Sequence, residues 1–567
     1  MDSSKKIGIG AAMTLPVLLW VAVILYYSVN LPWYDDFDPF PDFLRQWIND
    51  EALSDRLKLL FQPNNEHRMV IGKLVTLSYY WVTGHLNFTF LHIAGACFTL
   101  GTLYIFWISF SKSKINWWYF LPVPFLLFQL QYHLVFLWAI CSLQHQPVVF
   151  FICLSMFLLS RERFAWAVLA AICATYAMSN GIFVWPAGVV ILVLRSNYKQ
   201  LGIWFAAGAL AVGFYFYGLS AQGNESSIAF FVKYPHLSVL GFFAFLGGLF
   251  DFFPEKTIVV RSTLPVIMGF LVMIWIVIWL YRQLVPWLQA TFNWPKRSVS
   301  SSNAEISADR KSLDSFLLGI LTFLLVNALI IGLLRPRFGF FVMIVSNYKM
   351  YPALFLTVAY LTFINATSRK LIQKRVFKFA LIVSIAIWGI SIYSYLPVIS
   401  ERNKYLTVNG YNQEHNAFGL GHVPFSKGAA YVDTLMKQMV SWSVFKYPDA
   451  PQTLADNIGR IQNPMPQQKG ITVTERDSIL YINDPESKFS LNRNHGQYAF
   501  VRDAEQLYFF KMAPHKYSGR NIFRQYDKGS DTEIPLTALK PGSYDLGIIN
   551  IENGKSEGGL LRKITIP

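Results

Sequence analysis

Long runs of apolar residues recur through the first 400 positions, separated by short polar loops. About 20 consecutive apolar residues are needed for a helix to cross the hydrocarbon core of a bilayer. We place about eleven candidate membrane spans in these runs, at 8–28, 88–110, 116–131, 147–160, 164–178, 182–194, 201–219, 263–281, 314–333, 350–366 and 378–396. The pattern therefore predicts a polytopic α-helical membrane protein.

The first run, from Ile7 to Val29, predicts an uncleaved helix, because no small-residue cleavage site follows it. With an odd number of spans and a cytoplasmic N-terminus, the C-terminus lies outside. The loops that then fall inside are all basic, as the positive-inside rule requires. They contain Lys5, Lys6, Lys112, Lys114, Arg161, Arg163, Arg195, Lys199, Arg282, Lys296, Arg297, Arg310, Lys311, Arg369, Lys370, Lys374, Arg375 and Lys378.

One apolar run does not fit this scheme. Counting Leu237–Phe253 as a span would place the basic loop at 282–313 outside. We therefore interpret this run as re-entrant or interfacial, which is tolerated where protein or water covers the backbone.

The outer side carries two large pieces. The first is the loop 30–87, in which 41–61 and 69–84 are amphipathic and predict helices, the second lying at the membrane interface. The second is the tail, which is helix-compatible to about Ile461 and then alternates apolar and polar residues. The alternating segments predict a β-sandwich with strands at 471–475, 479–484, 488–492, 497–503, 507–512, 533–539, 544–551 and 561–567, the segment 539–555 forming a closing hairpin.

The resulting domain plan has three parts. Residues 1–396 form a transmembrane domain, 397–462 a mixed connecting segment, and 463–567 a soluble periplasmic or extracellular β-sandwich-like domain that we expect to fold alone from about Met465.

Composition agrees with a membrane protein. The chain of 567 residues is 54% hydrophobic and 17% aromatic. Only 14% of its residues are charged, against about 25% in soluble proteins. The net charge of +16 could indicate nucleic-acid binding, but the basic excess lies mostly in short loops between apolar runs. The topology rule explains it, so we expect no nucleic-acid partner.

The strongest chemical signal follows the first span. Asp35, Asp36 and Asp38 stand among Trp33, Tyr34, Phe37 and Phe40. Three carboxylates in four residues repel one another unless a ligand, a metal or a base role uses them. The alternative is a wet juxtamembrane loop with an aromatic belt. The sequence names no certain cofactor and no metal ligand set, although these carboxylates could hold a divalent cation such as Mg²⁺ or Mn²⁺.

A second signal lies in the same loop, where Glu66, His67 and Arg68 follow two asparagines. Its alternative is a helix N-cap by Asn64 or Asn65. A third signal is Arg335 and Arg337, which emerge on the outer side against the positive-inside trend, with Tyr348 and Lys349 just before the next span. An arginine fork suits a phosphate, and headgroup snorkelling is the alternative.

Weaker signals lie near the outer ends of other helices, where polar side chains could line a cavity or make interhelical hydrogen bonds. They are Gln129, Gln131, His133, Gln144, His145, Asn180 and Asp251. The two histidines lack tight ligand spacing, and the sequence contains no phosphate-cradling P-loop, no GxGxxG and no zinc-protease motif.

These features together resemble the GT-C glycosyltransferases over roughly residues 1–400. The segment 33–38, WYDDFD, is similar to their aspartate motif in the first outer loop, and 64–68, NNEHR, to an element of one bacterial branch. The segments 179–188 and 337–349 are similar to later patches of that branch, which often has an Arg-Tyr pair where this chain has Asn347–Tyr348–Lys349.

The resemblance implies an inverting transfer from a polyprenyl-phosphate-sugar donor to a glycan, lipid-linked glycan or protein acceptor. It places this reaction at the outer face of a bacterial cytoplasmic membrane. Asp35, Asp36 and Glu66 are the candidate bases, in that order. Asp38, His67, Arg68, His133, Gln144, His145, Asn180, Arg335, Arg337, Tyr348 and Lys349 are the candidate substrate-binding residues.

Three alternatives remain open. A transporter or flippase of lipid-linked sugar predicts inverted repeats and charges at mid-membrane, and the sequence shows no repeat. A non-enzymatic polysaccharide assembly protein leaves the acidic segment unexplained. A polysaccharide polymerase would share the outer-loop chemistry and differ in its acceptor.

Overall fold

The chain divides into two compact units in a computed structural model, which describes residues 3–50, 52–65, 67–219, 224–292, 308–461, 463, 470–519, 521, 524–552 and 555–567. Unit 1 consists of Met1–Ile24, Leu57–Val75 and Leu91–Tyr395. Unit 2 consists of Leu25–Arg56, Thr76–Phe90 and Leu396–Pro567. The predicted acidic segment of the outer loop therefore belongs to the same unit as the tail.

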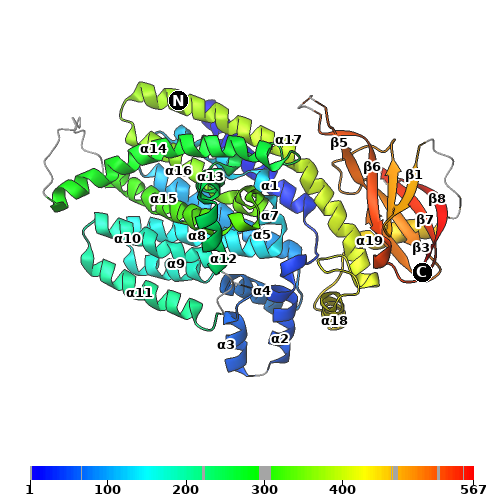
Figure 1. Ribbon diagram of the computed structural model, residues 1–567. Helices are drawn as coiled ribbons and strands as arrows, with labels where there is room; N and C mark the ends of the chain where they lie inside the picture. The colour runs from blue at the N-terminus through cyan, green and yellow to red at the C-terminus, as the bar shows by residue number, and fades with distance from the viewer. Residues whose placement is uncertain are drawn as a thin grey trace. The chain divides into compact units, whose positions relative to one another are not determined.

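Up to Asn416, the described residues form mainly helices (Figure 1). Their bounds are α1 (Ser3–Tyr27), α2 (Phe43–Asn49), α3 (Leu53–Phe61), α4 (Val70–Thr83), α5 (Phe88–Ser111), α6 (Pro122–Leu127), α7 (His133–Leu137), α8 (Ala139–Ser160), α9 (Phe164–Thr175), α10 (Val184–Leu194), α11 (Tyr198–Phe216), α12 (Asn224–Lys233), α13 (Pro235–Leu246), α14 (Ile258–Phe292), α15 (Ala308–Leu334), α16 (Met350–Ala366) and α17 (Lys370–Asn416). Aromatic packing ties them together. Trp20 of α1 is fully buried, with its ring centroid 5.2 Å from that of Phe128 and 5.1 Å from that of Phe136.

Long apolar helices make the chain a membrane-embedded protein by length and composition. Within the described residues, seven helices are long and apolar enough to cross a bilayer. They are Ile7–Tyr27, Phe88–Ser111, Trp117–Leu137, Ala139–Ser160, Ile258–Gln289, Ala308–Leu334 and Lys370–Asn416. The expected count of about eleven is not confirmed. The difference lies partly in short helices: α9 has 12 residues and so spans only about 18 Å, well short of the hydrocarbon core.

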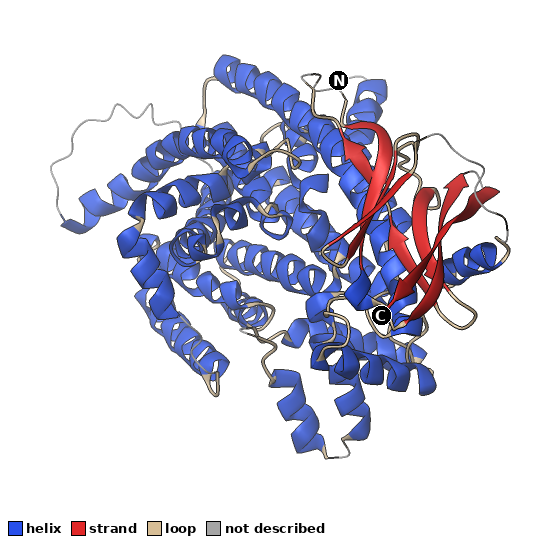
Figure 2. Ribbon diagram, turned by 45° about the vertical axis from the view of Figure 1, so that its right-hand side comes forward, coloured by secondary structure: helices blue, strands red, loops and turns tan. Residues whose placement is uncertain are grey.

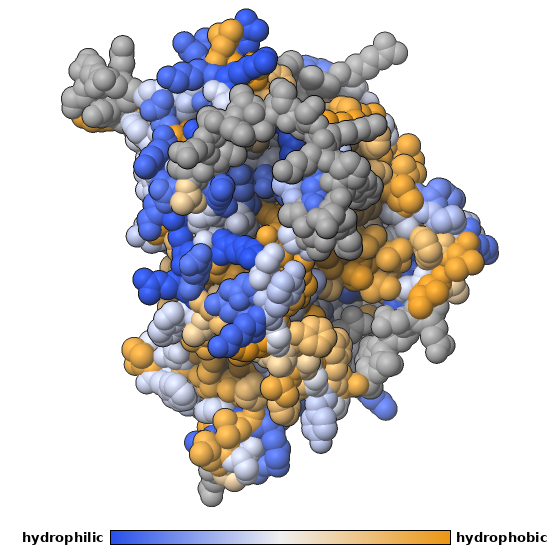
Figure 3. Space-filling view, turned by 90° about the vertical axis from the view of Figure 1, so that its left-hand side faces the viewer, coloured by the Kyte–Doolittle hydropathy of each residue, from blue (hydrophilic) through white to orange (hydrophobic). Residues whose placement is uncertain are grey.

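Several loops predicted to be cytoplasmic meet at one end of unit 1. Arg161 contacts Asp309 at 3.2 Å, and Arg195 donates to the carbonyl of Ser160. The side chain of Asn365 donates to the carbonyl of Arg310. Figure 3 views the side at the left of Figure 1, where α10 ends and α11 begins, and shows hydrophilic residues gathered on part of that face. These contacts bring the loops near 161, 195, 309 and 365 together, and the membrane topology itself stays a prediction.

The run Leu237–Phe253 lies mostly in α13, a helix of 12 residues that follows α12 after a bend of 101°. At the start of α13, the carbonyl of Ser238 lies close to Gly332, near the end of α15. At the far end of the run, Asp251 bonds to Lys349, just before α16. Because α15 ends at Leu334 and α16 begins at Met350, the two ends of the run meet the same end of unit 1. This geometry agrees with a re-entrant segment.

The outer loop contains the expected helices with one difference. The stretch 41–61, predicted as one helix, is split into α2 and α3, and Asp50 between them is extended (φ −79°, ψ 124°). The side chain of Arg56 donates to the Asp50 carbonyl at 2.7 Å, which fixes this break. The stretch 69–84 is a single helix, α4, as predicted.

The tail of unit 2 is a β-sandwich of two antiparallel sheets, drawn in red in Figure 2. One sheet has the order β1-β2-β6-β5 and the other β4-β3-β7-β8. The strands are β1 (Thr472–Arg476), β2 (Ile479–Asp484), β3 (Gly496–Arg502), β4 (Leu507–Lys511), β5 (Ala513–Lys516), β6 (Tyr526–Pro535), β7 (Gly542–Glu552) and β8 (Lys555–Ile566). Leu480 and Ile534 of the first sheet share a buried core with Val501, Leu546 and Ile548 of the second. The predicted closing hairpin is β7–β8.

The prediction of a strand at 488–492 is wrong. Its backbone carbonyls bond to side chains of a helix instead of to a neighbouring strand. The ammonium of Lys404 donates to the Ser490 carbonyl at 2.6 Å. The Leu491 carbonyl accepts from the hydroxyls of Ser400 and Tyr27.

Helices cover the outer face of the second sheet. The long helix α17 continues without a break from the predicted last span to Asn416, and α18 (Lys427–Ser441) and α19 (Ala450–Gly459) follow it. Residues of α17 and α19 and residues of the sheet form one buried cluster, namely Val408, Tyr411, Leu454, Ala455, Ile458, Tyr498, Phe500, Phe509 and Ile549. The sandwich therefore has apolar packing on both faces of β3 and β7.

Candidate functional site

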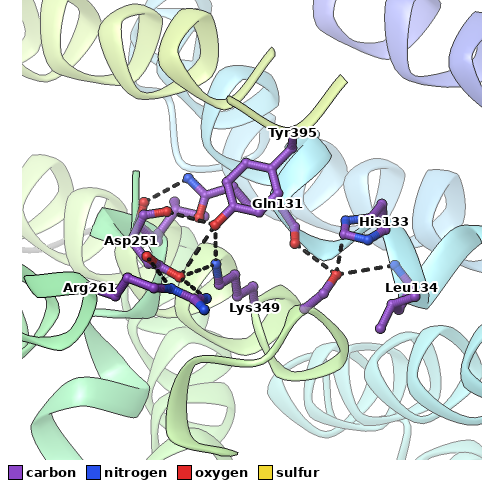
Figure 4. Close-up of polar contacts among 9 residues, drawn as sticks. Gln131, His133, Leu134, Asp251, Arg261, Lys349 and Tyr395 are labelled. Atoms are coloured by element: carbon purple, nitrogen blue, oxygen red, sulfur yellow. Dashed lines mark hydrogen bonds and ion pairs between the residues drawn. The ribbon is translucent and has the colours of Figure 1, made fainter. Parts of the chain in front are cut away.

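A buried ion-pair network lies at the end of unit 1 where α16 begins (Figure 4). Lys349 Nζ and Arg261 Nη2 each lie 2.7 Å from the Asp251 carboxylate. The hydroxyl of Tyr395, from α17, accepts a hydrogen bond from Lys349 and donates to the Asp251 carbonyl. Two cations and one phenol thus converge on a single aspartate. Asp251 is 0% and Lys349 1% exposed, whereas Arg261 is 22% exposed.

The electrostatics of this network follow from burial and pairing. Burial raises the pKa of Asp251, but Lys349 and Arg261 oppose it and hold that pKa below its usual range. Burial lowers the pKa of Lys349 to about 8, although Asp251 favours its charged form. The pairing favours the charged form of both groups, and removal of either partner would leave a buried charge unpaired.

A second chain of hydrogen bonds fixes the segment that carries Lys349. Ser346 Oγ donates to the carbonyl of Gln131 at 2.8 Å, and it lies 3.3 Å from Nδ1 of His133. The amide of Gln131 in turn donates to the carbonyl of Leu249, two residues before Asp251. Predicted site residues His133 and Lys349 therefore lie on connected backbone segments.

Three more of the predicted site residues, His145, Asn180 and Tyr348, lie close together among the helices. His145 Nδ1 lies 2.7 Å from the hydroxyl of Tyr351, to which Asn180 donates at 2.6 Å. The Tyr348 ring lies 6.2 Å from the His145 ring. These are interhelical hydrogen bonds, the alternative that the sequence left open. Gln144, the remaining member of this group, is buried.

The arginines that follow α15 are partly exposed. Arg337 donates to the hydroxyl of Ser226, and its guanidinium lies 4.5 Å from the centre of the Phe338 ring. Arg335 lies 5.8 Å from the same ring. The loop between α15 and α16 thus carries Arg335 and Arg337 as well as Lys349 of the buried network.

The guanidinium of Arg68 is bonded to backbone carbonyls of the protein itself. Its guanidinium donates to the backbone carbonyls of Phe61, Tyr215 and Tyr217, at the C-terminal ends of α3 and α11. Helix C-termini carry unpaired carbonyls and partial negative charge, which a cation satisfies. A role for Arg68 in ligand binding stays a prediction.

Asn64 and His67 are joined by backbone hydrogen bonds, and neither asparagine caps a helix, because the next helix, α4, begins only at Val70. The backbones of Asn64 and His67 bond to each other in both directions at 2.8 and 3.0 Å, and Asn65 has φ +52°. Glu66 lies outside the residues that the structure describes, so its predicted role as a base is untested.

The acidic segment of unit 2 is a strained turn. Tyr34 has φ +48°, which is rare for a bulky residue. Asp36 is 1% exposed and accepts from the backbone of Trp33 at 2.9 Å, so its carboxylate is used within the turn. Asp35 and Asp38 are more exposed. Burial raises the pKa of both, and Asp42 and Asp35 raise that of Asp38 further.

Residues 420–422, from the C-terminal part of the chain, pack against this turn. The Tyr34 amide donates to the carbonyl of Leu420 at 2.8 Å. Gly421 has φ +142°, and a Cβ there would lie 2.9 Å from Tyr34 Cα. The ring of His422 lies 6.3 Å from that of Phe37, and its electrostatic interaction with Asp38 lowers the pKa of that carboxyl. His422 was missed by the sequence interpretation, since nothing local links it to residues almost 400 positions earlier.

The structure therefore brings the predicted residues into separate groups. Asp35, Asp36 and Asp38 belong to unit 2, and the remaining predicted residues that are described belong to unit 1. Among the described residues, no three His, Cys, Asp or Glu side chains lie together as a metal site would need. Within the part of the chain that the structure describes, the acidic turn therefore shows no ligand set for a divalent cation.

Comparison with known proteins adds no family assignment, because no family model, curated protein or solved structure matches this chain. The class that the fold supports is a membrane-embedded helical protein with a β-sandwich tail.

Proposed function

We propose that this protein transfers a sugar from a polyprenyl-phosphate-sugar donor to an acceptor at the outer face of the cytoplasmic membrane. The observation that carries the proposal is the acidic turn just after α1. Asp35 and Asp38 lie beside the strained residue Tyr34 and remain accessible, while partial burial of their carboxylates raises the pKa of each. Strain and like charges cost stability, and they persist where a site uses them.

Position favours Asp35 as the base. It stands eight residues after Tyr27, the last residue of a candidate span, so it cannot move far from the membrane surface. A lipid phosphate holds the donor's anomeric carbon at that surface, whereas the acceptor hydroxyl comes from water. A raised pKa makes a carboxylate a better proton acceptor. Asp36 is the weaker candidate because its carboxylate already accepts from Trp33.

The proposed reaction is a single displacement. Asp35 takes the proton of the acceptor hydroxyl while the oxygen attacks the anomeric carbon. The bond from that carbon to the phosphate oxygen breaks, and the lipid phosphate leaves with the electron pair. Cationic side chains would stabilise the charge that develops on the phosphate, and the sequence resemblance suggests Arg335 and Arg337 for this role. Attack opposite the leaving group inverts the anomeric configuration.

The test compares two carboxylates of the same turn. Asp35→Asn keeps the shape and removes the basic oxygen, so release of polyprenyl phosphate from the donor should fall by about a thousandfold. Asp42→Asn is the matched control, because Arg45 and Gln46 already bind the Asp42 carboxylate. It should retain turnover. Wild-type turnover in Asp35→Asn would refute the assignment of the base.

Donor binding needs its own variant. Arg337→Ala should weaken binding of the donor while the protein still inserts and purifies, and Arg337→Lys should restore only part, since the fork is lost. Unchanged donor affinity in Arg337→Ala removes this residue from the proposed site.

A flippase of lipid-linked sugar is the second candidate, and the Lys349–Asp251 pair favours it. Buried ionisable residues in membrane proteins often mark transport or proton pathways, and this pair is buried at one end of unit 1. Liposomes that hold the purified protein separate the two functions. Movement of donor across the bilayer with no new glycosidic bond supports the flippase.

A further inference from the structure

The ion-pair network has the composition of an anion site that already contains an anion. Lys349 and Arg261 supply two positive charges, Tyr395 supplies a hydroxyl, and the Asp251 carboxylate occupies the point where they converge (Figure 4). Arg261 binds both carboxylate oxygens, at 3.3 and 2.7 Å. Guanidinium and ammonium groups in this arrangement bind phosphate as readily as carboxylate.

The segment that carries Asp251 could withdraw without breaking a long helix. Asp251 follows the short turn Gly248–Phe250 at the end of the run that begins with α13, and a loop leads from it to α14 at Ile258. The cations, in contrast, stand at helix starts: Arg261 in the first turn of α14 and Lys349 immediately before α16. Movement of the aspartate alone would leave the cations in place.

Charge also favours exchange with a dianion. One aspartate balances only one of the two cations that bind it. A phosphate monoester carries about −1.5 to −2 at neutral pH and would balance both. Arg261, the partly exposed member of the three, is the point at which an anion would first make contact.

We infer that Lys349, Arg261 and Tyr395 form a site for a phosphate monoester, and that Asp251 is a built-in competitor that fills the site when no phosphate is bound. This inference rests on the proposed function, since the monoester of that reaction is the polyprenyl phosphate product. The site would bind this product more tightly than the donor, whose phosphodiester carries one charge fewer.

The direction in which Asp251→Ala changes the affinity for a phosphate monoester distinguishes this inference from a purely structural ion pair. The probe is farnesyl phosphate, titrated into the full-length protein in discs of phosphatidylcholine. Asp251→Ala removes the competitor and should tighten binding by about tenfold, whereas Lys349→Ala or Arg261→Ala should weaken it by at least about tenfold. Asp309→Ala is the matched control, because Asp309 pairs with Arg161 at the other end of unit 1. Equal or weaker binding in Asp251→Ala overturns the inference.

Two further experiments use the Tyr395→Phe variant and the wild-type protein, in which Asp251, Lys349 and Arg261 are all present. Tyr395→Phe removes one hydroxyl and should weaken binding of farnesyl phosphate by several-fold. In the wild-type protein, farnesyl phosphate should speed hydrogen exchange of backbone amides at 247–257, because Asp251 leaves its partners. Binding without faster exchange there overturns the inference, and so does the absence of binding.

Comparison of two probes shows whether the site takes free phosphate or a lipid phosphate. The same measurements distinguish failure of the anion site from failure of the proposed sugar transfer. Inorganic phosphate alone should reproduce the exchange signature if the site takes free phosphate, and only farnesyl phosphate should do so if the lipid is required. Because no sugar transfer enters these measurements, a protein that shows the signature but never transfers sugar refutes the proposed function and not the anion site.

Discussion

Removing the helices that cover the second sheet should unfold the sandwich. The sequence predicted that a fragment from about Met465 to Pro567 folds alone. The structure gives a reason to expect otherwise, because Tyr498, Phe500, Phe509 and Ile549 are buried against helices that this fragment lacks. A chain of 465–567 would expose these four side chains to water.

The magnitude follows from that burial. Burying one large apolar side chain contributes about 1.5–3 kcal/mol, so the exposed face loses about 6–12 kcal/mol. Small domains are stable by only about 5–15 kcal/mol. We expect the fragment 465–567 to lack cooperative unfolding and to bind a hydrophobic dye, and the fragment 397–567, which keeps α18, α19 and the end of α17, to unfold cooperatively in urea.

Circular dichroism and urea titration of both fragments test this. In the longer fragment, Ile458→Asp should reproduce the loss, because Ile458 is fully buried in the covered face, while Asp456→Ala on the exposed side of α19 should not. The reasoning fails if 465–567 unfolds cooperatively with the same midpoint as 397–567.

Three further predictions concern topology, capping and charge. A reporter active only in the cytoplasm, fused after Pro567, should be silent, since seven and eleven spans both place the two termini on opposite sides; activity would indicate an even number. Arg68→Ala should destabilise the protein by about 3 kcal/mol, measured as a lower melting temperature in detergent, with Arg163→Ala as an exposed control and no loss counting against the capping role. Because burial raises the pKa of Asp38, the folded state binds its proton more tightly and stability falls as pH rises through that pKa. Asp38→Asn should therefore raise the melting temperature at pH 7 but not below about pH 4; an Asn variant that is less stable at pH 7 contradicts this.

The alternation of apolar and polar residues predicted the tail well, because half-buried strands follow a period of two. The exception at 488–492 shows the limit of the pattern. Those residues alternate too, but Lys404 and Ser400 compete for their carbonyls. A choice between a strand and a helix as hydrogen-bond partner depends on tertiary contacts, which no local pattern records.

The candidate site was predictable only as isolated residues. Charges at the ends of apolar runs drew attention to Lys349 and Arg337, because burial of a cation is costly. Their partners could not be named, since Asp251 stands 98 positions from Lys349. Arg261 was missed entirely. It sits just before a predicted span, on the outer side, and no local pattern in the sequence links it to Asp251, ten positions earlier.

The order of the two sheets leaves β1, β5, β4 and β8 at their edges. β5 is only four residues long, contains Pro514 and has an irregular register. β1 ends in Glu475 and Arg476, and β8 carries Arg562 and Lys563. Short, charged or proline-containing edges resist the addition of a strand from another chain. Copies of this protein crowded into one bilayer would hold their tails at high local density, and we expect these edges to keep the tails from joining into a continuous sheet.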